Sequence, residues 1–288
     1  MDVTVRVPAS SANLGPGFDC LGLALDLWAT VRVHTADMPP ASEPSVARLV
    51  RQGINAAFEG IGEPPGVAID WDRTIPVARG LGASAALRGA GVLAANALLE
   101  GRLDEEEVFA IGTRLEGHPD NMAPTLFGGL QVSLHDSEGS LIHVEAEFPK
   151  SLKVVVFVPD FEMPTQESRR RLPRQLSRED AVFNWSRVAL LLAALAAGRF
   201  DLLDEATQDR MHQPVRSEIF PGLQPIMAAA KDGGAVASYL SGGGSTVAAF
   251  VVKGEERVSR LMTQAAVANG FSGRSIITAP SKQGAHLV

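Results

Sequence analysis

The stretch Ile75–Asn96, IPVARGLGASAALRGAGVLAAN, governs how the rest of the chain is interpreted. An extended piece ends at Pro76, a glycine-rich turn occupies residues 80–84, and a proline-free run of small and apolar residues continues to Leu99. The glycines of the turn permit tight backbone conformations and the close approach of a ligand, because they carry no Cβ. The stretch therefore predicts a turn that leads directly into a helix.

A helix that begins in this way has backbone N–H groups without partners in its first turn. Together with the positive end of the helix dipole, these groups form a site for an anion, commonly a phosphate. Ser84 adds a hydroxyl that can either cap the helix or ligate Mg²⁺. An ordinary helix start with good turn residues also accounts for the stretch, so both interpretations remain open at this point.

Two known phosphate-binding motifs fit the turn poorly. A P-loop requires a Lys after its second glycine, and none follows Gly82. Gly80, Gly82 and Ala85 satisfy the dinucleotide-binding pattern formally, but that pattern also needs a second strand that ends in an acidic residue. Glu100 has the right spacing, yet the segment before it has helical character. A Rossmann fold is therefore disfavoured.

Composition bounds the class of protein. A chain of 288 residues fits one large or two moderate domains, and 45% apolar with 20% charged residues is typical of a globular protein. The net charge of −7 argues against a general nucleic-acid binder. Cys20 is the single cysteine, which excludes a disulfide framework and fits a reducing compartment.

Two further features bear on location. No basic segment with an apolar core opens the chain, so we expect no signal peptide and a cytoplasmic protein. The longest apolar helix candidate, Val188–Ala197, is about half as long as a bilayer span requires. We therefore expect it to be a buried core helix and expect no membrane association.

Hydrophobic periodicity predicts an α+β chain with an N-terminal domain of residues 1–150 and a C-terminal domain of residues 151–288. Loops are predicted at Pro8–Gly17 and Met38–Pro44. The predicted strands are Val3–Val7, Leu21–Leu27, Trp28–His34, Gly66–Ile75, Leu126–Leu134, Leu141–Glu145, Lys153–Pro159, Ala235–Leu240, Thr246–Val252 and Ser275–Ala279. The predicted helices are Ser45–Gly60, Ala85–Leu99, Asp104–Gly117, Gln166–Leu172, Arg178–Gly198, Asp201–Met211, Pro225–Asp232 and Glu255–Asn269.

Polar side chains gather at two points of the N-terminal part. Asn13 and Asp19 lie in one short segment and can orient a hydroxylated or amino-bearing substrate, although both are also ordinary turn formers. Polar side chains also crowd together at the end of a predicted helix, namely those of Glu116, His118, Asp120 and Asn121. A carboxylate there can complete a Mg²⁺ site together with phosphate oxygens and water. The crowding, more than any single residue, indicates a site.

Arginines and a second glycine loop occur in the C-terminal part. Thr165 and Arg169 are one helical turn apart, and Arg216 is a second candidate for holding a carboxylate in a bidentate fork. Runs of arginine are otherwise most often solvated. The segment Ser241–Thr246, SGGGST, is a weak glycine-loop signal by itself.

The pattern Pro-x-x-x-Gly-Leu-Gly-x-Ser-Ala-Ala at residues 76–86 resembles the phosphate loop of the GHMP small-molecule kinases. PASSANLGPGFDCLGLAL at residues 8–25 is similar to their first motif in the form found in homoserine kinases, and SGGGST is similar to the third. EGHPDNMAPTLFGGL at residues 116–130, and the segments around Thr165 and Arg216, resemble homoserine kinases as well. These motifs occur in order along nearly the whole chain, which is therefore identified as a member of this family.

The resemblance implies a two-domain GHMP kinase fold, with an N-terminal domain like domain 2 of a small-subunit ribosomal protein and a ferredoxin-like C-terminal domain. It also implies ATP-dependent phosphorylation of the side-chain hydroxyl of L-homoserine, a step of threonine biosynthesis, with Mg²⁺. ATP would lie along the glycine loop, and the substrate would lie between the domains. Family members are commonly dimers, so a homodimer is a further expectation.

The same resemblance implies roles for individual residues. Ser84 and Glu116 match the metal-binding pair, and His118 and Asn121 match residues that orient the substrate and contact the transition state, with no residue assigned as a base. The residues matched to ATP binding are Pro76, Val77, Ala78, Arg79, Gly80, Leu81, Gly82, Ala83, Ser84, Ala85 and Ala86. The residues matched to substrate binding are Asn13, Asp19, His118, Asn121, Thr165, Arg169, Arg216 and Gly243.

Departures from the family pattern and rival functions complete the prediction. Ala83 replaces the first Ser of the common Gly-Leu-Gly-Ser-Ser, and the short spacing from Glu116 to the next His leaves the placement of Glu116 open. A mevalonate- or shikimate-type kinase would have no use for Arg169 and Arg216 as a carboxylate-holding pair. A non-catalytic ATP-binding relative would have lost Glu116, and a Rossmann oxidoreductase would bind NAD.

Overall fold

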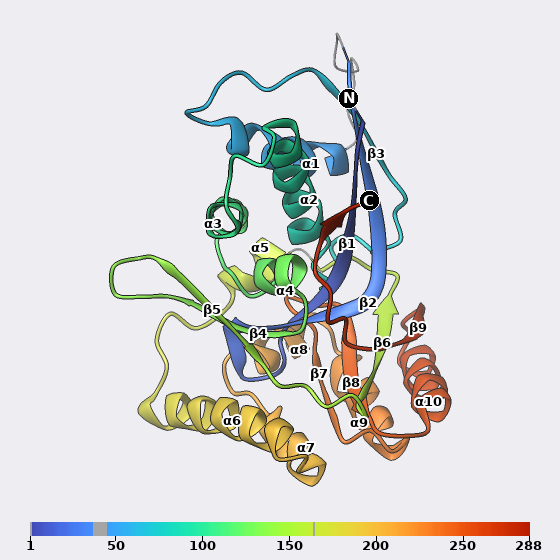
Figure 1. Cartoon of the computed structure of the whole chain (residues 1–288). Helices are drawn as coiled ribbons and strands as arrows, with labels where there is room; N and C mark the ends of the chain where they lie inside the picture. Colours follow the sequence, from blue (N-terminus) through green and yellow to red (C-terminus); the bar gives the residue numbers. More distant parts are fainter. Residues whose placement is uncertain (1, 37–44, 164) are drawn as a thin grey trace.

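The computed structural model of the chain describes residues 2–36, 45–163 and 165–288, and of residues 45 and 165–167 it describes the backbone alone. Within these ranges the chain forms two antiparallel sheets with helices packed against them, as Figure 1 shows. The predicted α+β class is confirmed. The predicted loop at Met38–Pro44 lies outside the described residues.

The first sheet is built on a long hairpin. Strands β1 and β2 pair antiparallel from Asp2 opposite His34 to Asn13 opposite Gly17. The strand order is β10-β1-β2-β4-β5, and β3 also pairs with β2, so the last strand of the chain returns to the first. The bounds are β1 (Asp2–Asn13), β2 (Gly17–Thr35), β3 (Val67–Trp71), β4 (Leu130–His135), β5 (Leu141–Ala146) and β10 (His286–Leu287).

The prediction of a loop over Pro8–Gly17 is wrong for most of its length, because β1 continues to Asn13. Ser10 and Ser11 are fully buried in this extension, and their hydroxyls bond the side chains of the half-buried Asn121 and the buried Ser241. Because Ser10 and Ser11 have small side chains, the strand can pass between elements that pack closely around it. The tip of the hairpin reaches the second sheet, where the Gly242 N–H donates to the Ala12 carbonyl over 2.9 Å.

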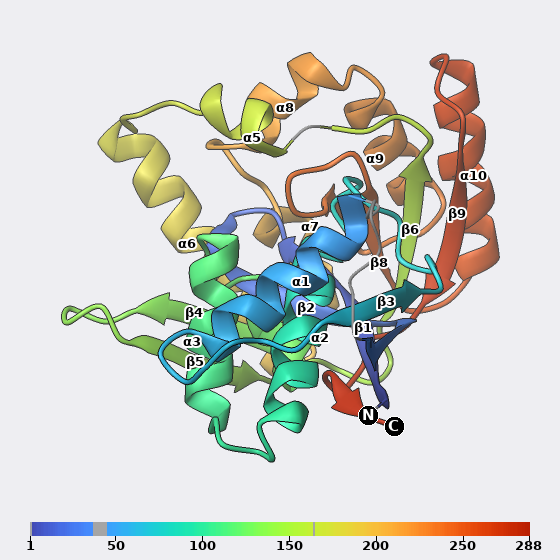
Figure 2. The ribbon, with the colours of Figure 1, turned by 90° about the horizontal axis from the view of Figure 1, so that it is seen from above.

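Helices cover one face of the first sheet, and Figure 2 shows them from above. The glycine turn leads into α2, whose alanines are largely buried, and Asp104 is the N-cap of α3, with a reciprocal bond to Glu107. The short helix α4 was not predicted, and its last two residues were placed in the strand Leu126–Leu134, which in the structure begins at Leu130. The bounds are α1 (Ser45–Phe58), α2 (Ala83–Leu98), α3 (Glu105–Glu116) and α4 (Met122–Phe127).

The second sheet has the antiparallel order β7-β8-β6-β9. Numbered within this sheet, the order is 2-3-1-4, and helices separate the first two and the last two strands, which is the ferredoxin-like arrangement that was predicted. The strands are β6 (Lys153–Pro159), β7 (Ala237–Leu240), β8 (Val247–Val251) and β9 (Gly273–Thr278). The helices are α5 (Thr165–Arg170), α6 (Arg178–Ala196), the 3₁₀ turn Phe200–Leu202, α7 (Leu203–Ala206), α8 (Gln213–Ile219), α9 (Leu223–Asp232) and α10 (Glu255–Ala268).

The predicted helix Asp201–Met211 is too long, since α7 ends at Ala206. Asp209 then accepts hydrogen bonds from the backbone N–H groups of His212 and Gln213, over 2.8 and 2.7 Å, and so starts α8, a helix that was not predicted. A carboxylate that accepts hydrogen bonds from these N–H groups satisfies donors that have no partner within the helix.

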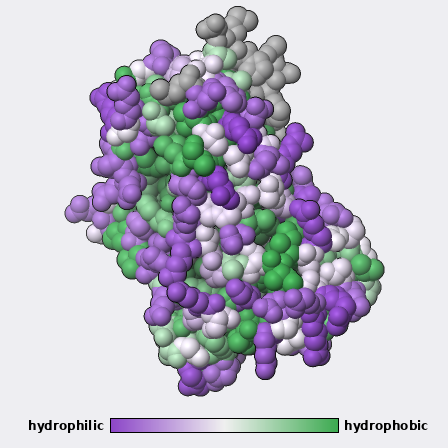
Figure 3. Space-filling model, turned by 45° about the vertical axis from the view of Figure 1, so that its right-hand side comes forward, coloured by the Kyte–Doolittle hydropathy of each residue, from purple (hydrophilic) through white to green (hydrophobic). Residues whose placement is uncertain are grey.

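Buried side chains of both sheets join in one apolar core, in which Val5 and Leu23 belong with Val154 and Phe250. The predicted domain boundary near residue 150 falls between β5 and β6 and remains a prediction. The surface in Figure 3 is a mixture of hydrophilic and hydrophobic patches. Over the described ranges, none of the helices has the length and apolar character needed to cross a bilayer.

Candidate active site

A cleft beside the glycine turn gathers most of the predicted site residues. Its walls come from the β1–β2 tip, the start of α2, the segment from α3 to α4, and the loop between β7 and β8, closed by arginines of α5 and α8. The lining residues are Asn13, Phe18, Asp19, Ala78, Arg79, Gly80, Gly82, Ala83, Ser84, Glu116, His118, Asp120, Asn121, Arg169, Arg216, Gly242 and Gly243. The side chain of Thr165, a predicted substrate ligand, lies outside the described residues.

Gly80 and Gly82 have positive φ angles of 78° and 68°. A Cβ at Gly80 would lie 2.2 Å from the Ser241 carbonyl oxygen, and one at Gly82 would lie 2.0 Å from the Ser10 hydroxyl. The space was expected to serve a ligand, but protein groups occupy it. The two glycines therefore allow the turn to pack tightly against β1 and against the second glycine loop, residues 241–246. In this contact the Ser241 hydroxyl donates to the Gly80 carbonyl over 2.6 Å.

Arg79 is directed from this turn toward the second sheet. Its guanidinium donates to the carbonyl oxygens of Pro159 and Asp160, over 2.9 and 2.6 Å, at the end of β6. Leu81 is fully buried. The backbone N–H groups at the start of α2 are the groups of the turn suited to bind an anion, because a helix cannot pair its own first donors.

Ser84 does not cap α2, whose N-cap Gly82 has no side-chain cap bond. Its hydroxyl donates instead to Glu116 Oε1 over 2.7 Å, so the structure brings the predicted metal pair together. Arg88, one turn later on α2, donates to Glu116 Oε1 over 2.5 Å and to the Ser84 hydroxyl over 3.0 Å. The Glu116 side chain is only 8% exposed, so this ion pair is largely shielded from water.

The oxygens of Ser84 and Glu116 fit Mg²⁺, a hard cation that combines one or two carboxylates with phosphate oxygens. A second group with ligand atoms within 4.8 Å of one another consists of Asp19, His118 and Asp120. It fits Mg²⁺ less well, since it includes a ring nitrogen. The first pair is therefore the better magnesium candidate.

His118, Asp120 and Asn121 form a small network beside this pair. His118 Nδ1 bonds Asp120, and the Ser10 hydroxyl donates to Asn121 Oδ1 over 2.9 Å. Burial alone would lower the pKa of His118, but the hydrogen bond and the charge of Asp120 outweigh it and raise the pKa above its usual value. Asn121 Nδ2 donates one hydrogen bond to Asp120 Oδ1 over 3.3 Å, and the raised pKa of His118 favours its protonated form.

Asp19 and Arg169 form a bidentate ion pair on the opposite side of the cleft. The guanidinium donates to the two carboxylate oxygens over 2.7 and 2.6 Å and lies 5.0 Å from the centre of the Phe18 ring. The hydrogen bonds that Arg169 donates to Asp19 raise the pKa of Arg169. Asn13, at a φ of 70°, supports the pair, since its Oδ1 accepts from the Asp19 N–H over 3.1 Å.

Arg216 is 1% exposed and is anchored from below. It donates to the Gly242 carbonyl over 3.0 Å and to His212 Nδ1 over 2.8 Å, while His212 Nε2 bonds the Gly15 carbonyl. These contacts require a neutral His212, and burial lowers its pKa accordingly. Burial, and then the nearby Arg169, lowers the pKa of Arg216 to about 10. The Arg216 Nε has no partner among the described residues.

Sequence reasoning missed two neighbours of the predicted residues, namely Arg88 and His212, and it named Asp120 in the cluster without its bond to His118. Arg88 carried a usable signal, because it is a charged residue in an otherwise apolar helix, one turn after Ser84. His212 carried none, since only the fold brings it under the tip of the β1–β2 hairpin.

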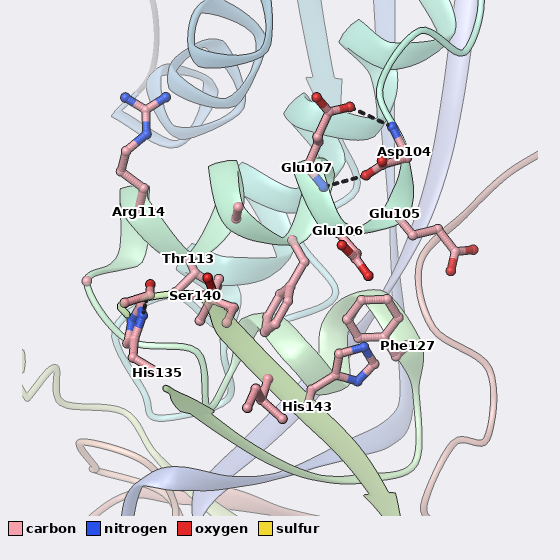
Figure 4. Close-up of a pocket in the computed structure, with 16 residues that line it drawn as sticks. Asp104, Glu105, Glu106, Glu107, Thr113, Arg114, Phe127, His135, Ser140 and His143 are labelled. Carbon is pink, nitrogen blue, oxygen red and sulfur yellow. Dashed lines mark hydrogen bonds between the residues drawn. The ribbon is translucent and has the colours of Figure 1, made fainter. Parts of the chain in front are cut away.

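A separate groove lies between α3 and the β4–β5 hairpin, as Figure 4 shows. His143 stacks on Phe127 there at 3.9 Å between ring centres, and burial lowers the pKa of His143. Glu105 and Glu106 line the same groove. None of the predicted site residues borders it, so it is distinct from the cleft.

Comparison with known proteins agrees with this geometry. The family described as GHMP kinases N terminal domain matches residues 46–129, and the family described as GHMP kinases C terminal matches residues 191–269. Fold and site thus define a kinase of the GHMP class. A homoserine kinase of Moorella thermoacetica is 40% identical, with 99% of each chain covered, and one of Deinococcus radiodurans is 45% identical, covering 86% of this chain and 83% of its own.

A solved structure supports the same placement. The crystal structure of homoserine kinase from Cytophaga hutchinsonii matches with a TM-score of 0.88 and 28% identity, and covers 100% of this chain and 97% of its own. The chain belongs to the homoserine kinase family. The mevalonate kinase of Methanococcus jannaschii, at 15% identity and a TM-score of 0.70, shares the fold.

Proposed function

We propose that the chain transfers the γ-phosphoryl group of ATP to the side-chain hydroxyl of L-homoserine, giving O-phospho-L-homoserine for threonine biosynthesis in the cytoplasm. The observation that carries this proposal is the Asp19–Arg169 pair in the same cleft as the glycine turn. An α-amino acid presents an ammonium and a carboxylate on one carbon. Asp19 can pair with the ammonium group and Arg169 with the carboxylate. The substrate then replaces the hydrogen bonds that these two side chains make with each other.

Arg216 and Asn13 extend the amino-acid site. Arg216 lies in the wall beside Arg169 and its Nε lacks a partner among the described residues, so this buried donor can turn to a carboxylate. Gly243, in the same wall, leaves the cleft open at the loop between β7 and β8. The Thr165 prediction is retained on the resemblance alone.

The phosphate end follows from the start of α2. Backbone N–H groups from Gly80 to Ala85 would cradle the phosphates, since the Ala86 N–H already donates to the Gly82 carbonyl. Ala78 and Arg79 line the cleft and would border the nucleotide, and Pro76 and Val77 are retained on the resemblance alone. Ser84 and Glu116 would hold Mg²⁺, which neutralises phosphate charge when bound. Phosphoryl transfer asks mainly for positioning and charge stabilisation, and these groups supply both.

Asn121 and His118 orient the substrate and stabilise the transition state, and neither residue removes a proton from the substrate. The Asn121 amide is a donor toward the cleft, and a protonated His118 donates as well. A free carboxylate base is absent from the described lining, since each of its carboxylates has a cationic partner. The pairs are Asp19 with Arg169, Glu116 with Arg88, and Asp120 with His118. The proton of the hydroxyl therefore passes to the γ-phosphate.

An ADP-release assay with Mg-ATP tests the proposal by comparing L-homoserine, L-serine, mevalonate and shikimate. Turnover that is specific for L-homoserine is expected, since only the amino acids use both charges of the Asp19–Arg169 pair and only L-homoserine has the longer side chain. Turnover of mevalonate or shikimate in preference would overturn the substrate assignment and leave the kinase class intact. NAD titration with no binding would remove the oxidoreductase alternative.

A further inference from the structure

Arg88 occupies an unusual position for a cation. It lies on the apolar helix α2 beside Ser84 and Glu116, which line the cleft, and a single nitrogen, Nη1, donates to both Glu116 Oε1 and the Ser84 hydroxyl. Since Ser84 in turn donates to Glu116, the three atoms form a closed triangle with sides of 2.5, 2.7 and 3.0 Å. The guanidinium thus satisfies the two oxygens that fit a metal.

The triangle places a positive charge at the atoms that metal binding needs. The Ser84 hydroxyl donates a hydrogen bond to Glu116 Oε1 and accepts one from Arg88 on one of its two lone pairs. A divalent cation on the oxygens of Ser84 and Glu116 would therefore lie beside the Arg88 guanidinium. Two cations cannot share these atoms without repulsion inside a site that is shielded from water.

We propose that Arg88 is a positioning residue that acts as an internal counter-ion: it neutralises Glu116 and orients Ser84 before the metal binds, and competes with the divalent cation for both. The inference rests on the proposed function, because it takes Ser84 and Glu116 as the metal pair. It goes further by making metal entry depend on the release of an arginine.

The structure offers a direction for this release. Arg88 Nε also donates to Gln52 of α1 over 3.1 Å, and Gln52 is exposed. The guanidinium can therefore withdraw from Glu116 toward α1 while it keeps this contact. Its side chain is 19% exposed, against 8% for Glu116, so the arginine lies on the outer side of the pair.

Binding of Mn²⁺ alone to the nucleotide-free protein, followed by electron paramagnetic resonance, tests the proposal without any turnover. Replacing Arg88 by Met removes the competitor and keeps most of the apolar length of the side chain. We expect Arg88→Met to bind Mn²⁺ at least 10-fold more tightly than the unaltered chain. The matched control is Arg114→Met, which breaks the exposed pair between Arg114 and Glu59 and leaves Mn²⁺ affinity unchanged.

Thermal unfolding supplies the second readout. Without metal, Arg88→Met leaves a nearly buried carboxylate without its cation and should unfold at a lower temperature, and Mg²⁺ should raise that temperature more than it does in the unaltered chain. Equal Mn²⁺ affinity in both proteins, or weaker binding by Arg88→Met, would overturn the proposal. Should Arg88→Met fail to fold, Arg88→Lys keeps the charge as a single point and should bind Mn²⁺ with intermediate affinity.

Glu116→Gln separates this inference from the function on which it rests. Loss of Mn²⁺ binding in Glu116→Gln supports the metal pair whatever Arg88 does. Unchanged Mn²⁺ binding in Glu116→Gln would show that the metal lies elsewhere, which would overturn the metal assignment and the role of Arg88 together while leaving turnover of L-homoserine to its own assay.

Discussion

Asp19 and Arg169 stand 150 positions apart in the sequence and form two hydrogen bonds of 2.7 and 2.6 Å across the cleft. The pair joins the β1–β2 tip to α5, so the proposed substrate site draws on both parts of the chain. Both side chains are about one-third exposed, 32% for Asp19 and 39% for Arg169, which leaves the pair open to exchange with a ligand. Its strength as an isolated ion pair is correspondingly small.

Replacing Arg169 by Ala should impair binding of L-homoserine and spare ATP. Hydrogen bonds to charged groups contribute about 1.5–3 kcal/mol, so KM for L-homoserine should rise roughly 10- to 100-fold. Steady-state kinetics with each substrate varied in turn give the measurement. Arg170→Ala, the exposed neighbour, is the control and should behave as the unaltered chain. An equal rise in both variants would contradict the assignment.

Glu116→Gln should reduce turnover and raise the Mg²⁺ concentration needed for half-maximal rate. Loss of even an outer partner of a bound metal typically costs roughly 10- to 100-fold, and Glu116 is proposed as a ligand. Rates measured across a Mg²⁺ series give the comparison. Glu106→Gln, an exposed carboxylate on the same helix, serves as control, and a similar Mg²⁺ dependence in both variants would count against the site.

The pH dependence of His118 has a definite sign. Its pKa is raised in the folded chain, so protonated His118 stabilises the fold below its ordinary pKa, and this stabilisation is lost as pH rises through the folded value. Asp120→Asn should lower the pKa of His118, since the partner that raises it is gone. Proton NMR titration of the histidine rings provides the measurement. His143, whose pKa burial lowers, should titrate unchanged in the same spectra, and an unaltered His118 would refute the pairing.

Gly82→Ala should destabilise the chain more than Gly101→Ala does. Both residues have positive φ, at 68° and 79°, so both variants lose about 1–2 kcal/mol to backbone strain. A Cβ at Gly82 would also lie 2.0 Å from the Ser10 hydroxyl, whereas one at Gly101 would meet nothing within 4 Å. Urea unfolding measures the free energy of unfolding of each variant. Equal losses in the two variants would contradict the prediction, because they would mean that β1 shifts at Ser10 without cost.

Local rules predicted the elements that local chemistry determines. Asp104 with Glu107 forms a capping box, and the end of the apolar strand Lys153–Pro159 is marked by proline. The extension of β1 through Ser10 and Ser11 escaped prediction because small polar residues are typical of turns. There the buried partners, supplied by distant parts of the chain, override the local preference.

The site was predictable in its residue types and less so in its connections. The glycine turn, Asp19 and Glu116 lie in one cleft as the motifs indicated. The neutral His212 beneath Arg216 depends on a contact with Gly15 that no spacing in the sequence reveals. Short-range sequence patterns identify the side chains that line the cleft. The side chains that support these residues are brought to them only by the fold, so no local pattern reveals them.

The most direct test of the central claim is phosphorus NMR of the products formed from Mg-ATP and L-homoserine. The account predicts ADP together with a phosphate monoester whose phosphorus couples to the side-chain CH₂ of homoserine. ADP with inorganic phosphate alone, or a phosphorylated carboxylate in place of the monoester, would contradict it.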